Sequence, residues 1–210
     1  AQVMAAVRQW RVVVTSFPAH LPAMTHSIDT REGLPTEMQA LLRAHPRDTW
    51  PDNPNFAASI RNWMGAHQMF RQLGAIARSD TEAFLDKRLD DEDYVGRLGY
   101  YGDLLVRNLH GHHAWEDRRF FPELTAAHPA LAEGLEMLEG DHLALDELLD
   151  GFKRHSNRAI QLHQLDPSQV ADEAGTVHTF TTRLDRFLDR HLNDEEDLAV
   201  PILLHHQLRG

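Results

Sequence analysis

One motif occurs twice in the sequence. Both copies fit the pattern H-x3-E-[DE]-x4-P-x-L without a gap, at residues 112–124 and 191–203. On an α-helix, residues four apart lie one above the other on the same face. His112 is therefore expected beside Glu116, and His191 beside Glu195. An imidazole and a carboxylate paired in this way supply half of a metal site, so the repeat predicts one complete site built by two helices.

The composition narrows what the motif can mean. With 42% hydrophobic and 25% charged residues, the 210-residue chain is typical of a soluble globular protein. Its net charge of -11 argues against binding to nucleic acid or anionic membranes, which attract basic surfaces. No apolar run is long enough to cross a bilayer, and residues 1–14 carry arginines where a signal peptide needs an apolar stretch. We therefore expect a cytoplasmic protein.

Histidines and carboxylates are the available metal ligands. The absence of cysteine excludes disulfides, thiolate catalysis, iron–sulfur clusters and cysteine-type zinc sites. The chain has 15 histidines, which together with carboxylates suit non-haem iron, manganese or zinc.

Helical periodicity begins at Phe56. The preceding residues, 1–55, contain six prolines and no long period, so we expect an irregular N-terminal extension that packs on the domain, with one short helix over 36–44. The domain itself is expected over 56–210. Its four long amphipathic stretches and its lack of strand signals predict an all-α, up-down-up-down four-helix bundle.

The helix boundaries follow from local signals. A capping-box pattern at 79–82 predicts that the first long helix ends near Arg78 and that a shorter one follows to about Leu89. The second long helix is expected over 91–121. Pro129 and Pro167 are each expected in the first turn of a helix, where the missing N–H is no loss.

His67 and His142 interrupt the apolar stripes of the first and third helices. A lone histidine on such a stripe is more often a hydrogen-bonded core residue than a ligand. Here, however, four histidines and two glutamates would share one core, and an unpaired buried carboxylate carries a penalty of several kcal/mol. Two cations, bridged by both glutamates, would remove that penalty. The predicted metal ligands are His67, His112, Glu116, His142, His191 and Glu195.

This order of residues resembles the hemerythrin-like domain, also called the HHE cation-binding domain. The resemblance covers about residues 56–206 and rests on the doubled motif and on the two histidines in apolar helices. It implies a hemerythrin-like four-helix bundle with a non-haem di-iron centre, bridged by an oxo or hydroxo group and held by the six residues above. Manganese or zinc would accept the same ligands. The implied partner is a small diatomic molecule or peroxide.

Two positions depart from the oxygen-carrying members of that family. Those members have a second histidine four residues after the third-helix histidine, where this chain has Asp146, and an aspartate five residues after the last histidine. Here the fourth-helix carboxylate is Glu195, four residues after His191. The pattern is closer to symmetric, glutamate-bridged members, such as the iron-sensing domain of an F-box protein, and disfavours simple oxygen carriage. Asp146 could be a ligand, a partner of Arg71, or a residue that holds a ligand by a hydrogen bond; we favour the last.

Several neighbouring residues are not expected to bind metal. Asp117 and Glu196 point about 100° away from the ligand glutamates, so they are expected either to hold ligands in place or to lie on the surface. His110 and His113 are expected on other helix faces, Trp63 and Trp115 at plain core positions, and His205 and His206 at the C-terminal surface. A single E-x2-H at Glu139–His142 is half of what a ferritin-like di-iron site requires.

Three functions are compatible with such a centre. The first, which we favour, is binding of oxygen, peroxide or nitric oxide for sensing, storage or detoxification. The second is an enzyme that destroys peroxide or oxidises a substrate, although no catalytic residue is assigned. The third is an iron-responsive interaction module that folds when metal binds. The sequence leaves open which applies, and also the oligomeric state and the role of residues 1–55.

Overall fold

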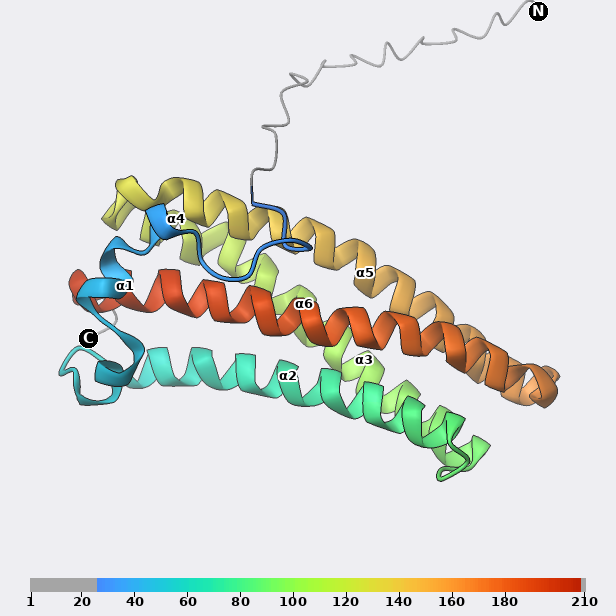
Figure 1. Ribbon diagram of the computed structural model, residues 1–210. Helices are drawn as coiled ribbons and strands as arrows, with labels where there is room; N and C mark the ends of the chain where they lie inside the picture. Colours follow the sequence, from blue (N-terminus) through green and yellow to red (C-terminus); the bar gives the residue numbers. More distant parts are fainter. Residues whose placement is uncertain (1–25, 209–210) are drawn as a thin grey trace, which may run out of the picture.

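The computed structural model describes residues 26–208, which form a bundle of four long helices (Figure 1). They are α2 (Ala58–Leu85), α3 (Asp91–Trp115), α5 (Ala132–Leu165) and α6 (Val170–His205). Each packs against two others, in the order α2, α3, α5, α6 and back to α2. The described residues contain no strand, so the predicted all-α bundle is confirmed. Within this part of the chain, no helix combines the length and apolarity that a membrane span requires.

The apolar core of the bundle is divided into two clusters. One cluster, which includes Phe70, Leu109 and Leu145, fills the half of the bundle near the α2–α3 connection. The other, which includes Phe120 and Leu138, fills the opposite half. Each long helix places at least one buried polar side chain between the two clusters. A polar layer therefore crosses the bundle between two apolar halves; its members are His67, His112, His113, Glu116, His142, His191 and Glu195.

The predicted end of the first helix near Arg78 is wrong, because α2 continues without a break to Leu85. Two polar residues of the capping-box pattern, Thr81 and Glu82, find partners along the helix instead. The Thr81 hydroxyl donates to the carbonyl of Ala77 at 2.8 Å, and Arg78 forms an ion pair with Glu82 at 2.9 Å, one turn away. Such i,i+4 contacts support a continuous helix, and packing against α3 and α6 overrides the local stop signal.

The second long helix contains a widened turn that the sequence did not predict. After α3 the chain continues as a π-helical turn, η3 (Glu116–Phe120), and then as α4 (Phe121–Ala127), six residues beyond the expected end. The Phe121 N–H donates to the carbonyl of Glu116, five residues back. Pro122 follows directly and has no N–H to donate, which weakens the ordinary helical ladder at this point. Single π turns of this kind are frequent at functional sites.

Pro129 and Pro167 stand where the sequence predicted. Each is the first residue of a 3-10 turn that leads into a long helix: η4 (Pro129–Leu131) into α5, and η5 (Pro167–Gln169) into α6. In the second turn, the Asp166 side chain accepts hydrogen bonds from Ser168 and Gln169.

Residues 26–52, which we call the pre-bundle segment, lie against the bundle (Figure 1). The segment contains two 3-10 turns, η1 (Thr36–Met38) and η2 (Arg47–Asp52), and the short helix α1 (Ala40–Ala44). Ile28 of the segment belongs to the cluster near the α2–α3 connection. The segment's other buried apolar side chains belong to the same core cluster as those of α4, α5 and α6; they are Leu34, Met38, Leu41 and Trp50. The rest of the predicted extension, residues 1–25, lies outside the described residues.

Trp50 is the largest anchor of the pre-bundle segment. It is 2% exposed, and its indole N–H donates to the carbonyl of His45 at 2.7 Å. We expect Trp50→Ala to lower the free energy of unfolding by about 3–5 kcal/mol, measured by urea denaturation, because a large buried side chain is lost. Tyr100→Ala, at a position that is 67% exposed, should change it by less than about 0.5 kcal/mol. Equal effects of the two substitutions would contradict the packing of this segment.

Candidate metal centre

The polar layer contains two groups of side chains whose ligand atoms lie within 4.8 Å of one another. One group consists of three histidines, His113, His142 and His191. The other consists of His67, His112, Glu116 and Glu195. All of the predicted ligands lie in these two groups, and His113 is an addition to them.

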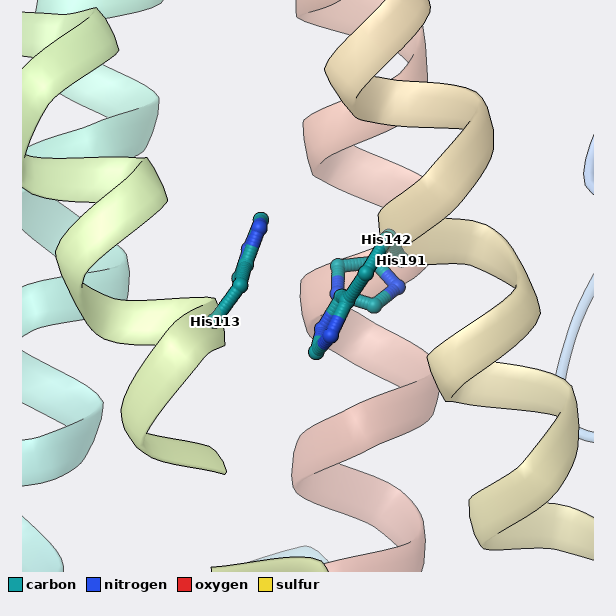
Figure 2. Close-up of side chains that lie close together, drawn as sticks. All are labelled: His113, His142 and His191. Atoms are coloured by element: carbon teal, nitrogen blue, oxygen red, sulfur yellow. The ribbon is translucent and has the colours of Figure 1, made fainter. Parts of the chain in front are cut away.

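The three histidines come from α3, α5 and α6 and point toward a common space between these helices (Figure 2). The rings of His113 and His142 stack with centroids 3.9 Å apart, and the His191 ring lies edge-on to that of His142 at 4.9 Å. Burial lowers the pKa of His191 to about 4 and holds the pKa of His113 well below its ordinary value. The imidazoles of His191 and His113 are therefore neutral at pH 7, which is the form that binds metals.

Polar atoms of these histidines are buried without a hydrogen-bond partner. They are both ring nitrogens of His113 and the Nε2 atoms of His142 and His191. Buried polar atoms in native proteins nearly always have a partner, so several orphaned nitrogens in one place indicate a missing one. A cation is the partner that accepts lone pairs from three imidazoles at once.

The second group has the spacing of ligands on one ion. His67 Nε2 lies 3.1 Å from His112 Nε2 and 3.4 Å from a Glu195 oxygen, and His112 Nε2 lies 2.8 Å from a Glu116 oxygen. Two atoms bound to one ion at about 2.1 Å and at right angles are about 3 Å apart. These three separations are close to that value, and a fourth, between His67 Nε2 and a Glu116 oxygen, is longer at 4.0 Å.

Glu116 and Glu195 lie between the two groups. Glu116 is also 3.8 Å from His142 Nε2, and Glu195 is 3.8 Å from His191 Nε2. Both side chains are fully buried, and both Glu195 oxygens have no hydrogen-bond partner. Burial, together with the charge of Glu116, raises the pKa of Glu195 well above its ordinary value. The pKa of Glu116 is lowered: burial opposes this, but hydrogen bonds with His112 and His67 outweigh it.

Three carboxylates outside the cluster hold three of the histidine rings. Asp117 lies 2.7 Å from His142 Nδ1, Glu196 lies 3.1 Å from His67 Nδ1, and Asp141 lies 3.2 Å from His191 Nδ1. An ionised carboxylate only accepts hydrogen bonds, so it keeps the proton on Nδ1 and leaves Nε2 free to bind metal.

The neighbours of Glu196 and Asp141 keep both carboxylates charged. Burial alone would raise the pKa of Glu196, but His67, Arg71 and Arg47 lower it to about 2. Burial likewise opposes ionisation of Asp141, and hydrogen bonds from His191 and Arg31 lower its pKa below the ordinary value. Asp117 and Glu196 were expected either in this role or on the surface; Asp141 was not expected.

Trp63 contacts one of the predicted bridging residues. Its indole N–H donates to Glu116 Oε1 at 2.7 Å, and its ring lies edge-on to that of His67, with centroids 4.2 Å apart. The sequence allowed this side chain to shield or tune the centre but favoured a core role, because an aromatic at helical spacing is usually plain core. Trp63 instead fixes one oxygen of Glu116, which leaves Oε2 without a hydrogen-bond partner and directed toward His142.

Asp146 is not part of the cluster, contrary to the interpretation of the sequence. Its side chain is 52% exposed and lies 3.3 Å from Nε2 of His110, one turn before His113 on α3. It therefore neither binds the site nor pairs with Arg71, which contacts Glu196 and Asn193. The spacing of four residues after His142 was correct for one helix face, but α5 turns that position toward solvent.

The expectation that His113 lies away from the centre is wrong, since its ring is 3% exposed and stands in the three-histidine group. The inward face of α3 is wide enough to include two adjacent residues. His112 faces α2, while His113 faces α5 and α6. The sequence did hold a signal: Val106, Leu109 and His113 continue a second row of the apolar stripe. At the equivalent position of the repeat stands the buried Leu192, so the two halves are not symmetric.

The C-terminal histidines lie at one end of the bundle, as expected. His205 is exposed, and His206 Nε2 lies 3.1 Å from His128 Nδ1.

A separate surface cavity of about 120 Å³ between α3 and α5 is lined by His110, Phe152 and Ser156, among others, and by no member of the polar layer.

Comparison with models of known protein families gives a match. The model of the hemerythrin HHE cation binding domain matches residues 58–203, more than half of the chain and all of the polar layer. No curated protein and no solved structure matches.

Proposed function

The chain belongs to the hemerythrin HHE cation-binding domain family, and from that premise we propose that its polar layer binds two iron ions and, through them, oxygen, peroxide or nitric oxide. The observation that supports this most is the set of buried atoms without partners in the three-histidine group and on the two glutamates that adjoin it, Glu116 and Glu195. Imidazole and carboxylate donors without any thiolate suit iron, although manganese and zinc accept the same ligands.

The two ions would have different surroundings. His113, His142 and His191 would hold one ion, and His67 and His112 would hold the other. Glu116 and Glu195 would each give one oxygen to each of the two ions. The ion with two histidines then has fewer protein ligands, so that it keeps a coordination position open for a small molecule. The oxygen carriers described above take an additional histidine from the third helix, whereas this chain supplies a fifth imidazole from α3.

The space around the polar layer favours a small ligand. The most exposed side chain of the cluster, that of His112, is 10% exposed, and the others are buried. A cavity of about 30 Å³, lined by Trp63, Trp115 and Phe120 among others, adjoins the side chain that contacts Glu116. A cavity of this size admits only a few water-sized molecules, so diatomic molecules and peroxide are the fitting class. When bound, iron supplies the open position and the change of oxidation state, while the chain positions the ligands and excludes bulk water.

Metal analysis of the purified protein tests the proposal. We expect about two irons per chain, with an absorption band from oxo-to-iron charge transfer that changes on exposure to air. The double variant His112→Ala/His191→Ala should lose the metal and the band, because each substitution removes a ligand from a different ion. The matched control is His110→Ala/His205→Ala, which changes two histidines outside the cluster. An unchanged metal content in the first variant would refute these ligands.

Titration with small ligands separates the candidate functions. Reversible spectral changes with nitric oxide or oxygen at one equivalent per centre would support sensing or storage. Consumption of many equivalents of peroxide per chain would identify an enzyme instead. A loss of helicity on metal removal, without either behaviour, would identify an iron-responsive module.

A further inference from the structure

The pre-bundle segment reaches the metal centre through Arg31. The guanidinium group donates to Asp141 at 2.5 Å and to Asp194 at 2.7 Å, and the side chain is 3% exposed. Asp141 in turn lies 3.2 Å from Nδ1 of His191. A chain of contacts thus runs from a residue that precedes the bundle, through a carboxylate 110 positions later in the sequence, to a predicted metal ligand.

A second arginine of the same segment forms the corresponding contacts on the other group. Arg47 donates to Glu196 at 2.8 Å, and Glu196 lies 3.1 Å from Nδ1 of His67. Arg47 also donates to Asp197 and to the carbonyl of Asn193, so that it joins the segment to α6. The pre-bundle segment therefore contacts the carboxylate partner of one histidine in each group.

We propose that Arg31 and Arg47 are positioning residues of the metal centre, and that the pre-bundle segment fixes the ligand histidines and slows the release of the ions. This inference rests on the proposed function. Each arginine acts through a carboxylate and touches no predicted ligand atom. Carboxylates that hydrogen-bond to ligand histidines orient the rings and tune the metal, so a cation that fixes those carboxylates acts on the same property.

The two arginines are not equivalent. Glu196 has a second cation in Arg71, at 3.0 Å, so it remains paired when Arg47 is removed. Arg31 is the one arginine within ion-pair distance of Asp141 among the described residues. Asp194 keeps Arg190 in either case. Loss of Arg31 therefore leaves a buried carboxylate without its cation, directly beside His191, whereas loss of Arg47 does not leave Glu196 unpaired.

The pre-bundle segment does not contact the third carboxylate, Asp117. Asp117 holds His142, but its side chain is 41% exposed, compared with 1% for Asp141 and 4% for Glu196. A half-exposed carboxylate is screened by water and needs no buried cation. The segment thus supports the side of the centre where the carboxylates are buried.

The experiment measures the rate at which iron passes from the loaded protein to an excess of chelator. We expect Arg31→Ala to release iron about 10-fold faster than the original protein, because loss of outer hydrogen-bonding partners weakens metal binding by about 10- to 100-fold. Arg47→Ala should have a smaller effect. The charge-transfer band should shift in Arg31→Ala and return in Arg31→Lys, a response that a purely structural role would not produce.

Arg190→Ala is the matched control. Arg190 also pairs with Asp194 and donates to the carbonyl of Glu32 in the segment, but it does not touch Asp141. Its variant should release iron within about 2-fold of the original rate, well below the effect of a lost outer partner. If Arg31→Ala does not fold, as judged by circular dichroism, Arg31→Gln keeps donor groups and serves instead. If the protein without substitutions binds no iron, the proposed function is wrong. If it binds iron but the Arg31 and Arg190 variants release iron at equal rates, only the positioning role is wrong.

Discussion

Glu116→Ala is expected to remove both metal ions from the protein. Glu116 lies 2.8 Å from His112 in one group and 3.8 Å from His142 in the other, so a single substitution takes an oxygen from each proposed ion. Loss of an outer partner of a ligand already weakens metal binding by about 10- to 100-fold, and loss of a shared ligand should weaken it by more than about 100-fold. Metal content after gel filtration, measured by mass spectrometry, should fall from about two ions per chain to nearly none.

The metal content of His113→Ala should differ from that of Glu116→Ala. His113 belongs to the three-histidine group alone, so its loss should weaken one ion and leave the ion near His67 and His112 in place. Glu136→Ala, at an exposed position on α5, should change nothing. If Glu116→Ala retained one ion, or if His113→Ala lost both as readily, the assignment of Glu116 as a bridge would be wrong.

Removal of the metal is expected to lower the stability of the protein, and Glu195→Met should reverse part of that loss. Both oxygens of Glu195 are buried without partners, and the carboxylate of Glu116 is close by. Breaking a buried charge pair by removing one partner costs about 3–5 kcal/mol, so we expect the metal-free protein to be less stable than the loaded one by an amount of that order. Urea denaturation in the presence and absence of iron measures this difference.

The methionine variant separates stability from function. Replacement of buried ionic groups by apolar residues of similar volume is often stabilising by about 1–4 kcal/mol, so metal-free Glu195→Met should be more stable than the metal-free original. It should also gain no stability from iron, because a shared ligand is lost. Glu147→Met, at an exposed position, should leave both quantities unchanged. A metal-free Glu195→Met protein less stable than the original would show that the carboxylate is satisfied without metal.

The sequence predicted those parts of the site that depend on the periodicity of single helices. The spacing from His112 to Glu116 and from His191 to Glu195 places each pair on one face, and the apolar stripes around His67 and His142 direct those two rings inward. These features are local. The bundle follows from four such stripes, since each apolar face must be buried against the others.

The remaining parts of the site depend on contacts between helices, which periodicity does not contain. Whether His113 as well as His112 faces inward depends on where α2, α5 and α6 stand around α3. Asp146 has the correct spacing from His142 but the wrong direction once α5 is packed. The contact between Arg31 and Asp141 joins distant segments, and an irregular stretch such as the pre-bundle segment gives no periodic signal. The false stop near Arg78 had the same cause: a local signal was outweighed by tertiary packing.

The separation of the core into two apolar halves has an electrostatic consequence for the layer between them. Hydrocarbon above and below is weakly polarisable, so a charge in the layer is poorly screened in comparison with one at the surface. Gain or loss of one electron by a bound ion would therefore change the electrostatic potential throughout the layer. The change would extend to Glu196 and its partner Arg47, whose side chain is 39% exposed. The pre-bundle segment is thus one route by which the oxidation state of a buried centre would reach the outer surface of the protein; the half-exposed Asp117, which contacts His142 directly, is another.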